Sequence, residues 1–304
     1  MPGVDALFTL VRRLASRQPV IEVAAPKWLV RRHGLAAMAA RAGAGTYRDE
    51  LARATIEWSR IDVELAPVVT AFVAAGIRVA AIKGVAYAKS LYDSPAERPM
   101  GDVDLLVQPA DYSRAAAVLT SAGFVAGVSP VLHHAHAWVR ETFVIDLHRS
   151  IIAPGRSRID LAAVWARMQP GWPDCAERLE PTDALVFHLV NLARNRLRVP
   201  LIHVIDTERL CQQGDATTAI ERARSWGLGR GAELALRFCT SILEERAGRP
   251  AGWLGPSVHD AVELHEPSVV HKVLFDVATA GSAPQLASRV VHFAANRLRR
   301  LSSR

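Results

Sequence analysis

Two aspartates stand two positions apart within "RPMGDVDLLV" (residues 98–107), where the chain becomes strongly apolar. In an extended strand residues i and i+2 point to the same side, so Asp102 and Asp104 would present two carboxylates to one point. Burying two like charges side by side is costly unless something compensates them. A divalent cation would remove that repulsion, and carboxylate oxygens suit Mg²⁺ or Mn²⁺, particularly where substrate phosphates complete the coordination shell. The pair therefore predicts a metal site that meets phosphate.

A third carboxylate is expected further along the chain, because an in-line displacement at phosphorus with two metal ions needs another acid to hold them. Asp146 in "VIDLH" (144–148) is the candidate, since it is also an acid within a strand-like apolar run. His148 follows two residues later, on the same face of that strand, and is a candidate supporting residue. The alternative is that Asp146 forms a salt bridge with Arg149 or another nearby arginine.

The phosphate-binding side of such a site is expected earlier in the chain, at a turn from a strand into a helix. The segment "AIKGVAY" (81–87) has this form. Gly84 lets the backbone approach a phosphate closely, the following helix offers free N–H groups, and Lys83 adds a positive charge. Arg98, in the loop before the two aspartates, is a second candidate cation. The alternatives are that Lys83 is a solvated surface charge and that Arg98 pairs with an acid of its own loop.

A small sheet is needed to hold these candidates together. Short apolar runs predict its strands, and helically spaced runs that end at Gly76 and Gly123 predict two of its helices. Because the strands alternate with helices and then pair, we expect an α+β (mixed α/β) fold with a small mixed sheet flanked by helices. The predicted strands are 77–82, 102–107, 134–140 and 142–150, and the predicted helices are 46–76, 85–92 and 108–123.

The strand signals fade after Ser150, and the rest of the chain is predicted to be mostly α-helical. In the first part of the chain Thr46 is placed to cap the long helix, and Pro67 is expected to kink or split it. The expected later helices are 157–168, 181–197, 203–213, 217–227 and 231–248, with two more around 257–280 and 284–301. We therefore divide the chain into an N-terminal helical region that packs on the core (1–76), a core that carries the candidate site (77–156) and a helical C-terminal domain (157–304).

The order of these features resembles a known family. A strand, Lys83-Gly84, a helix, a loop with an arginine, the Asp-x-Asp strand and a later Asp-x-His strand resemble the uncharacterised bacterial nucleotidyltransferase family, which belongs to the DNA polymerase β-type nucleotidyltransferase superfamily. The resemblance is densest over 77–150. It continues more weakly over 179–210, which is similar to the family's helical segment ending in an Asp-bearing helix. Superfamily members usually carry Gly-Ser before the Asp-x-Asp, whereas Lys83-Gly84 matches the narrower family.

The resemblance implies a nucleotidyltransferase core with three catalytic acids. Asp102 and Asp104 would bind two Mg²⁺ (or Mn²⁺) ions, and Asp146 would complete the second site and help deprotonate the attacking hydroxyl. The metal ions would bridge the triphosphate of an NTP and stabilise the leaving pyrophosphate, so that a nucleoside monophosphate passes to an acceptor. The acceptor would be a small molecule, a peptide or a protein with a hydroxyl group.

The resemblance also implies a phosphate-binding set and two further residues of interest. Lys83, Gly84 and Arg98 would contact the phosphates of the NTP. His148 and Asp206 would support the site or bind the acceptor.

Composition limits the class of protein. Half of the 304 residues are hydrophobic and 22% are charged, which is normal for a globular protein with a real core. The three cysteines lie far apart without a CxxC pair, which argues against a zinc site and a disulfide framework. The longest apolar stretch (65–77) contains a proline and is shorter than the ~18 residues that a membrane span needs. No signal-like segment is recognised either, so we expect a cytoplasmic protein.

Two other functions stay open on the sequence. A net charge of +7 makes a nucleic-acid partner possible, and hence a transferase for RNA ends or tRNA, but the arginines are spread along the chain and do not favour it. A non-catalytic nucleotide-binding module is the third possibility. In "HHAHAWV" (133–139) His134 and His136 are expected on one strand face, where they line an acceptor pocket or are merely packed, and the role of His133 is open. Two histidines alone do not form a zinc site.

Overall fold

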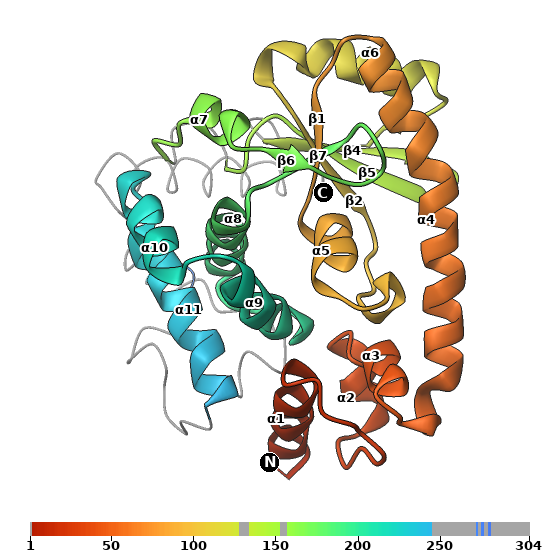
Figure 1. The fold of residues 1–304 in the computed structure, drawn as a ribbon, viewed down its shortest axis with the longest axis vertical. Helices are drawn as coiled ribbons and strands as arrows, with labels where there is room; N and C mark the ends of the chain where they lie inside the picture. Colours follow the sequence, from red (N-terminus) through yellow and green to blue (C-terminus); the bar gives the residue numbers. More distant parts are fainter. Residues whose placement is uncertain are drawn as a thin grey trace, which may run out of the picture.

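The computed structural model describes residues 2–127, 134–152 and 157–244, together with Lys272, Phe275, Asp276, Thr279 and Ala280. His133 lies outside the described residues, as do the predicted helices around 257–280 and 284–301 apart from those five positions. Within the described part the predicted α+β fold, a mixed sheet flanked by helices, is confirmed (Figure 1).

The strands are β1 (Val79–Ile82), β2 (Val103–Val107), β3 (Val125–Ala126), β4 (Ala135–Arg140), β5 (Phe143–His148), β6 (Gln169–Pro170) and β7 (Glu177–Arg178). Among the described residues they form one seven-stranded sheet in the order β3-β4-β5-β2-β1-β7-β6. The central strands β1 and β2 are antiparallel, whereas β5 lies parallel to β2 and β7 lies parallel to β1. The pairs β3–β4, β4–β5 and β6–β7 are antiparallel.

The register of the central strands places two of the predicted acids side by side. Asp104 of β2 is in register with Ile82 of β1 and with Asp146 of β5. Because side chains alternate along a strand, Asp104 and Asp146 share one face of the sheet, while their neighbours Leu105 and Ile145 point to the other. The acids therefore face the same layer of the protein.

The helices are α1 (Pro2–Ala15), α2 (Lys27–Arg32), α3 (Ala36–Arg41), α4 (Arg48–Ala74), α5 (Lys83–Leu91), α6 (Tyr112–Ser121), α7 (Leu161–Ala166), α8 (Pro181–Arg194), α9 (Ile202–Gln213), α10 (Ala216–Ser225) and α11 (Gly229–Leu243). One hydrophobic core joins α4 and α6 to the sheet face of Leu105 and Ile145. A second core lies on the other face of the sheet, which carries Leu106. It joins this face to α1 and to the four helices from α8 to α11. Figure 1 accordingly shows α4 on one side of the sheet and α8 to α11 on the other.

The N-terminal helices belong to the second core. α1 contacts α9 and α11, although almost two hundred residues separate them in the chain. Leu7 of α1 and Phe238 of α11 are both buried in this core. The short N-terminal helices α1, α2 and α3 and the helices after the sheet therefore form one layer over the face that carries the acids.

The long helix α4 differs from its prediction at two places. It is a single helix through Pro67, so the predicted split does not occur. Pro67 lies on the exposed side, where water can bond the carbonyl that a proline leaves without a donor. Thr46 does not cap the helix, because it lies in a short 3-10 turn (Gly45–Tyr47) before Arg48. The predicted end is confirmed, since Gly76 has a φ of 68° directly after the last turn.

The two-residue strands β6 and β7 were not predicted, because strands so short show no alternation of apolar residues. They come from the part of the chain expected to be mostly helical, and they extend the sheet beyond β1. The five helices predicted between 157 and 248 correspond to α7 to α11. Within the described part of the chain, no helix combines the length and the apolar character that crossing a membrane requires.

Candidate active site

The sheet brings three of the predicted site residues together. Asp104 is buried on β2, and Asp146 is half-buried next to it on β5. His148 lies two residues after Asp146 and is also buried, and one ligand atom from each of the three lies within 4.8 Å of the others. Asp102 precedes β2 and lies at the exposed edge of this group. Neither Asp102 nor Asp146 forms an ion pair with any described residue, so their charge is directed to solvent or to a ligand.

Lys83 is the cation of this group. β1 ends at Ile82 and α5 begins at Lys83 without a linking residue, and the backbone makes this turn with Lys83 at a φ of 50°. A positive φ is uncommon for a residue with a side chain, so the turn is held by its surroundings. The side chain extends over the sheet to form an ion pair with Asp104, and its Nζ lies 3.3 Å from His148 Nε2. Lys83 is therefore paired with a site acid rather than free at the surface.

The charges of the group set different acidities for its members. Burial raises the pKa of Asp104, but Lys83 and the hydrogen bond with His148 at 2.8 Å more than offset it and bring the value to about 2. Burial and the charges of Asp104 and Asp146 raise the pKa of Asp102 to about 6. Burial, and then the charge of Lys83, lowers the pKa of His148. The group thus keeps a negative charge that one lysine does not balance.

Arg98 lies in a different environment from the one expected. Its guanidinium is buried and donates three hydrogen bonds to Asp206, with Nη2 2.8 Å from Oδ2 and Nε 3.2 Å from both carboxylate oxygens. Asp206 is fully buried, and the Tyr92 hydroxyl donates a further hydrogen bond to its Oδ1 at 2.7 Å. Although burial acts in the opposite direction, Arg98 holds the pKa of Asp206 far below its usual value. Arg98 thus pairs with an acid of α9 rather than with an acid of its own loop.

Gly84 makes room for this arginine. A Cβ atom at Gly84 would lie 2.8 Å from Arg98 Nη1, which is closer than side chains normally approach. The absent side chain thus lets the guanidinium pack against the first turn of α5. Nη1 is the one guanidinium nitrogen without a hydrogen bond to Asp206, and Arg98 and Gly84 both line the cleft described below.

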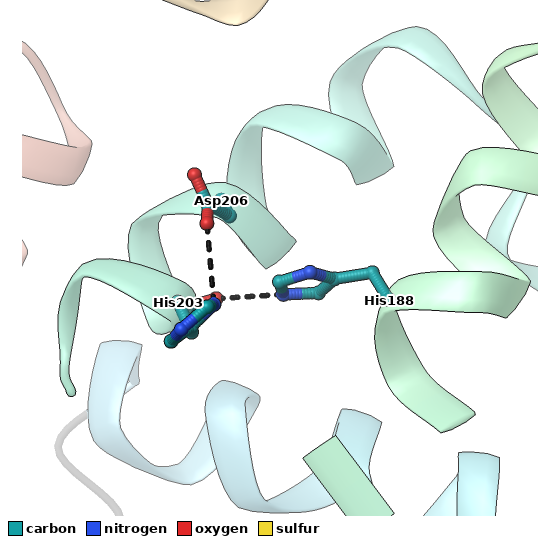
Figure 2. A group of neighbouring side chains, drawn as sticks. All are labelled: His188, His203 and Asp206. Carbon is teal, nitrogen blue, oxygen red and sulfur yellow. Dashed lines mark hydrogen bonds and ion pairs between the residues drawn. The ribbon is translucent and has the colours of Figure 1, made fainter. Parts of the chain in front are cut away.

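A second cluster lies on α8 and α9, and of its members the sequence analysis singled out Asp206 alone, through the family resemblance. His188, His203 and Asp206 each place a ligand atom within 4.8 Å of the others (Figure 2). His203 Nδ1 lies 3.4 Å from Asp206 Oδ2, and His188 Nε2 lies 3.0 Å from the His203 carbonyl oxygen. The spacing of His203 and Asp206 was the available signal, because residues i and i+3 share one helix face. We call these three residues the helical cluster, and Asp102, Asp104, Asp146 and His148 the sheet cluster.

Both clusters border one cleft with a volume of about 380 Å³. The N-terminal, central and C-terminal parts of the chain, as divided above, all contribute to its lining. The lining residues are Arg31, Arg32, Gly34, Lys83, Gly84, Tyr87, Arg98, Pro99, Met100, Gly101, Asp102, Asp104, Asp146, His188, Asn191, Pro200, Ile202 and His203. A ligand in this cleft could therefore contact residues of both clusters.

The two histidines before and within β4 do not share a strand face. The ring of His134 is buried 5.3 Å from the ring of His148, whereas the ring of His136 packs on Tyr112, 5.9 Å between centroids. His136 is in register with Leu147, whose side chain belongs to the core under α4. The expectation that His134 and His136 point the same way is therefore wrong, because His134 precedes the first residue of the strand.

Comparison with known proteins places this site in a family. None of the curated proteins compared with the chain matches it. A family described as uncharacterised nucleotidyltransferase matches residues 27–244, well over half of the 304 residues. The matched range contains the whole sheet and the helices α8 and α9, and hence both clusters. The resemblance found in the Asp-x-Asp strand is thereby confirmed: the chain belongs to this family of uncharacterised nucleotidyltransferases.

Proposed function

We propose that this protein transfers a nucleoside monophosphate from an NTP to a hydroxyl group of a small molecule, peptide or protein, with Mg²⁺ and with release of pyrophosphate. The observation that carries the proposal is the sheet cluster, in which Asp104, Asp146 and His148 converge beside the exposed Asp102. Family membership supports nucleotidyl transfer in general. The metal is inferred from the chemistry of the site, and the acceptor class is what the family resemblance implies.

The donor set of the sheet cluster fits a divalent cation. Asp102 and Asp146 have no ionic partner among the described residues. Burial, together with repulsion from Asp104 and Asp146, raises the pKa of Asp102 to about 6, and a cation would offset both effects. Carboxylate oxygens are the ligands that Mg²⁺ prefers, with substrate phosphates and water completing the shell. Asp102, Asp104 and Asp146 would hold the ion, which would supply positive charge at the reacting phosphate. The ammonium of Lys83 now occupies part of this space, so Lys83 would turn away when the ion binds.

The cations around the cleft have separate tasks in this proposal. Lys83 lies at the first turn of α5, and once released from Asp104 it can reach a phosphate in the cleft. Free N–H groups at the start of α5 would add hydrogen bonds to the same phosphate. Arg98 would act mainly by fixing α5 against α9, because most of its hydrogen-bonding capacity is used on Asp206. Its Nη1 would be the part directed at the nucleotide.

Incubation with each of the four α-³²P-labelled NTPs and a cell extract tests the proposal. We expect one NTP to label a defined fraction of the extract in a Mg²⁺-dependent way, and Asp104→Asn to abolish the labelling. Fractionation into small molecules, proteins and RNA then identifies the acceptor class, and label on RNA would favour the RNA-directed alternative. Tight NTP binding without labelling by any NTP would contradict the proposal and favour a non-catalytic nucleotide-binding module.

A further inference from the structure

His203 is the half-buried member of the helical cluster. It is the second residue of α9, its side chain is 22% exposed, and it lines the cleft. Its Nδ1 is buried and has no hydrogen bond, with Asp206 Oδ2 3.4 Å away. Its Nε2 has no hydrogen bond to a described residue either, yet it is not among the buried atoms without a partner. Nε2 is therefore the ring nitrogen open to the cleft.

The imidazole of His203 is oriented from two sides. Its ring lies 5.5 Å from the ring of His188, whose Nε2 is 3.0 Å from the His203 carbonyl oxygen. Asp206 faces Nδ1, and Arg98 and Tyr92 hold Asp206 itself in place. Figure 2 shows Asp206 and His188 approaching His203 from different directions. An acid that faces one ring nitrogen favours the tautomer with the proton there, which leaves the other nitrogen as a proton acceptor.

The helical cluster is poorly suited to a metal ion, despite its ligand geometry. Both oxygens of Asp206 accept hydrogen bonds from a guanidinium that would repel a second cation. His188 Nε2 is occupied by the His203 carbonyl and by Thr207 Oγ1, at 3.0 and 3.1 Å. Burial lowers the pKa of His188 to about 4, so it stays neutral and adds no charge. The cluster is a hydrogen-bonding network in which His203 Nε2 is open to the cleft.

A continuous series of contacts joins Asp206, which supports the His203 ring, to the sheet cluster. Asp206 is bonded to Arg98, Arg98 Nη1 packs against Gly84, and the next residue, Lys83, is paired with Asp104. His203 thus lines the same cleft as Asp102, Asp104 and Asp146, and its supporting residues are connected to theirs. A nucleophile bound at His203 would share this cleft with a phosphate held by the sheet cluster.

We propose that His203 Nε2 binds the attacking hydroxyl of the acceptor and takes its proton, with Asp206 as the positioning residue. This inference rests on the proposed function. In the step, the O–H bond of the acceptor breaks and its proton passes to Nε2. The hydroxyl oxygen forms a bond to the α-phosphorus, and the bond from that phosphorus to the bridging oxygen breaks with its electron pair on pyrophosphate. His203 then releases the proton to water.

His203 is better suited to this task than Asp146, to which the family resemblance assigned it. An acid that binds a metal ion is a weak proton acceptor, because the cation stabilises its ionised form. An imidazole exchanges its proton near neutral pH, which is where a general base works best. The assignment therefore gives metal binding to the sheet cluster and proton transfer to the helical cluster.

Chemical rescue tests this assignment, using the extract fraction that the wild type labels from its α-³²P-NTP. We expect His203→Ala to lower the initial labelling rate by about 10²-fold or more, and added imidazole to restore much of it, because the vacated space opens to the cleft. NTP affinity, measured by titration without acceptor, should stay the same. His203→Asn, which keeps a donor toward Asp206 and fills the space, should be equally slow without responding to imidazole.

His136→Ala is the matched control, because that ring packs on Tyr112 outside the cleft, and it should keep the wild-type rate with and without imidazole. Wild-type labelling by His203→Ala, or a loss that imidazole does not relieve although the variant folds and binds NTP, would overturn the role of His203 alone. In either case loss of labelling in Asp104→Asn would leave the proposed function standing. A wild type that labels nothing with any NTP would overturn both.

Discussion

The sheet cluster and the helical cluster are both built from aspartate and histidine side chains, but they differ in charge balance. Each brings carboxylate and imidazole atoms within 4.8 Å on the wall of one cleft. The sheet cluster holds three acids against the single ammonium of Lys83. The helical cluster holds one acid, Asp206, against the bidentate guanidinium of Arg98.

This difference shows why similar clusters serve different chemistry. Burial and the neighbouring acids raise the pKa of Asp102, and Asp146 has no ionic partner among the described residues, so a cation at the sheet cluster would gain free energy. In the helical cluster the pairing with Arg98 already neutralises Asp206, so a cation would gain little and would have to displace a buried pair. Ligand spacing therefore has to be weighed together with the charge balance when a metal site is proposed.

The largest expected effect follows from removing an acid of the sheet cluster. Asp104→Asn should lower nucleotidyl transfer by about 10³-fold or more, because positive charge at the reacting phosphate supplies much of the rate enhancement. Mg²⁺ should raise the melting temperature of the wild type and should have little effect on the variant. Without metal the variant should fold. An equal response to Mg²⁺ in both proteins would show that the cation binds elsewhere.

Breaking the helical cluster should lower the free energy of unfolding and leave the affinity for Mg²⁺ unchanged. Arg98→Met leaves Asp206 buried without its charge partner, and such losses destabilise proteins by about 3–5 kcal/mol. The exposed pair of Arg17 and Asp93, with side chains 53% and 60% exposed, is the matched control. Arg17→Met should change the free energy of unfolding by less than about 1 kcal/mol. Urea unfolding of both variants measures the two values.

The Mg²⁺ affinity of Arg98→Met shows whether the helical cluster takes part in binding the cation. Provided that Arg98→Met folds, its Mg²⁺ affinity in the absence of nucleotide should equal that of the wild type. A large loss of Mg²⁺ affinity in Arg98→Met would mean that the helical cluster contributes to the cation site.

Replacing Lys83 should have an intermediate effect, which weakens the binding of NTP and strengthens the binding of Mg²⁺ alone. Lys83→Ala removes one charge-assisted contact to phosphate, which should weaken NTP binding by about ten- to a hundred-fold. It also removes a cation that competes for Asp104, so Mg²⁺ alone should bind more tightly than to the wild type. Calorimetric titration with Mg²⁺ and with a non-hydrolysable NTP measures both.

Lys89→Ala is the control for Lys83, since Lys89 pairs with Asp62 and packs on Trp172 away from the cleft. It should leave both affinities unchanged. Lys83→Arg should restore NTP binding only in part, because a planar guanidinium does not replace a compact ammonium. If Lys83→Ala binds NTP and Mg²⁺ as the wild type does, Lys83 has no part in the site.

The sheet cluster was predictable from the sequence because its signal is local. Asp102 and Asp104 share a strand face through a spacing of two, and Asp146 and His148 repeat that spacing. The strands that carry them are apolar runs between glycines and prolines, which the sequence also indicates. The pairing of Asp104 with Asp146 needed only the assumption that these strands neighbour each other, and the register confirms that they do.

The helical cluster was not predictable because its partners are distant in the chain. Arg98 and Asp206 are separated by 108 positions, and nothing in either local sequence indicates the other. His203 stands on a helix whose apolar pattern reports burial but not which pocket the helix borders. Asp206 was marked only by its family resemblance. Its partner and the role of Gly84 as space for a guanidinium required the structure.

The smallest expected effect is a pH dependence that only the sheet cluster should show. In the metal-free protein the pKa of Asp102 is about 6 against a usual value of 3.8, so between these pH values the folded protein holds a proton that the unfolded chain has released. This proton stabilises the folded state at low pH, and its contribution is lost as pH rises through 6. Asp102→Asn cannot ionise and should lack this loss. It should therefore be more stable than the wild type at pH 7 but not at pH 4, by less than about 1 kcal/mol because solvent screens a residue at the mouth of the cleft. Asp206 stays ionised in the folded protein over the same range, since Arg98 holds its pKa far below its usual value. The difference between the wild type and Asp206→Asn should therefore hardly vary between pH 5 and pH 7, and should shift against the wild type only nearer pH 4, where the unfolded chain begins to bind a proton. Urea unfolding in EDTA from pH 4 to pH 7 measures both differences. A constant difference for Asp102→Asn would mean that neither burial nor the neighbouring acids disfavour its charge, and the reason for expecting a cation at the sheet cluster would be lost.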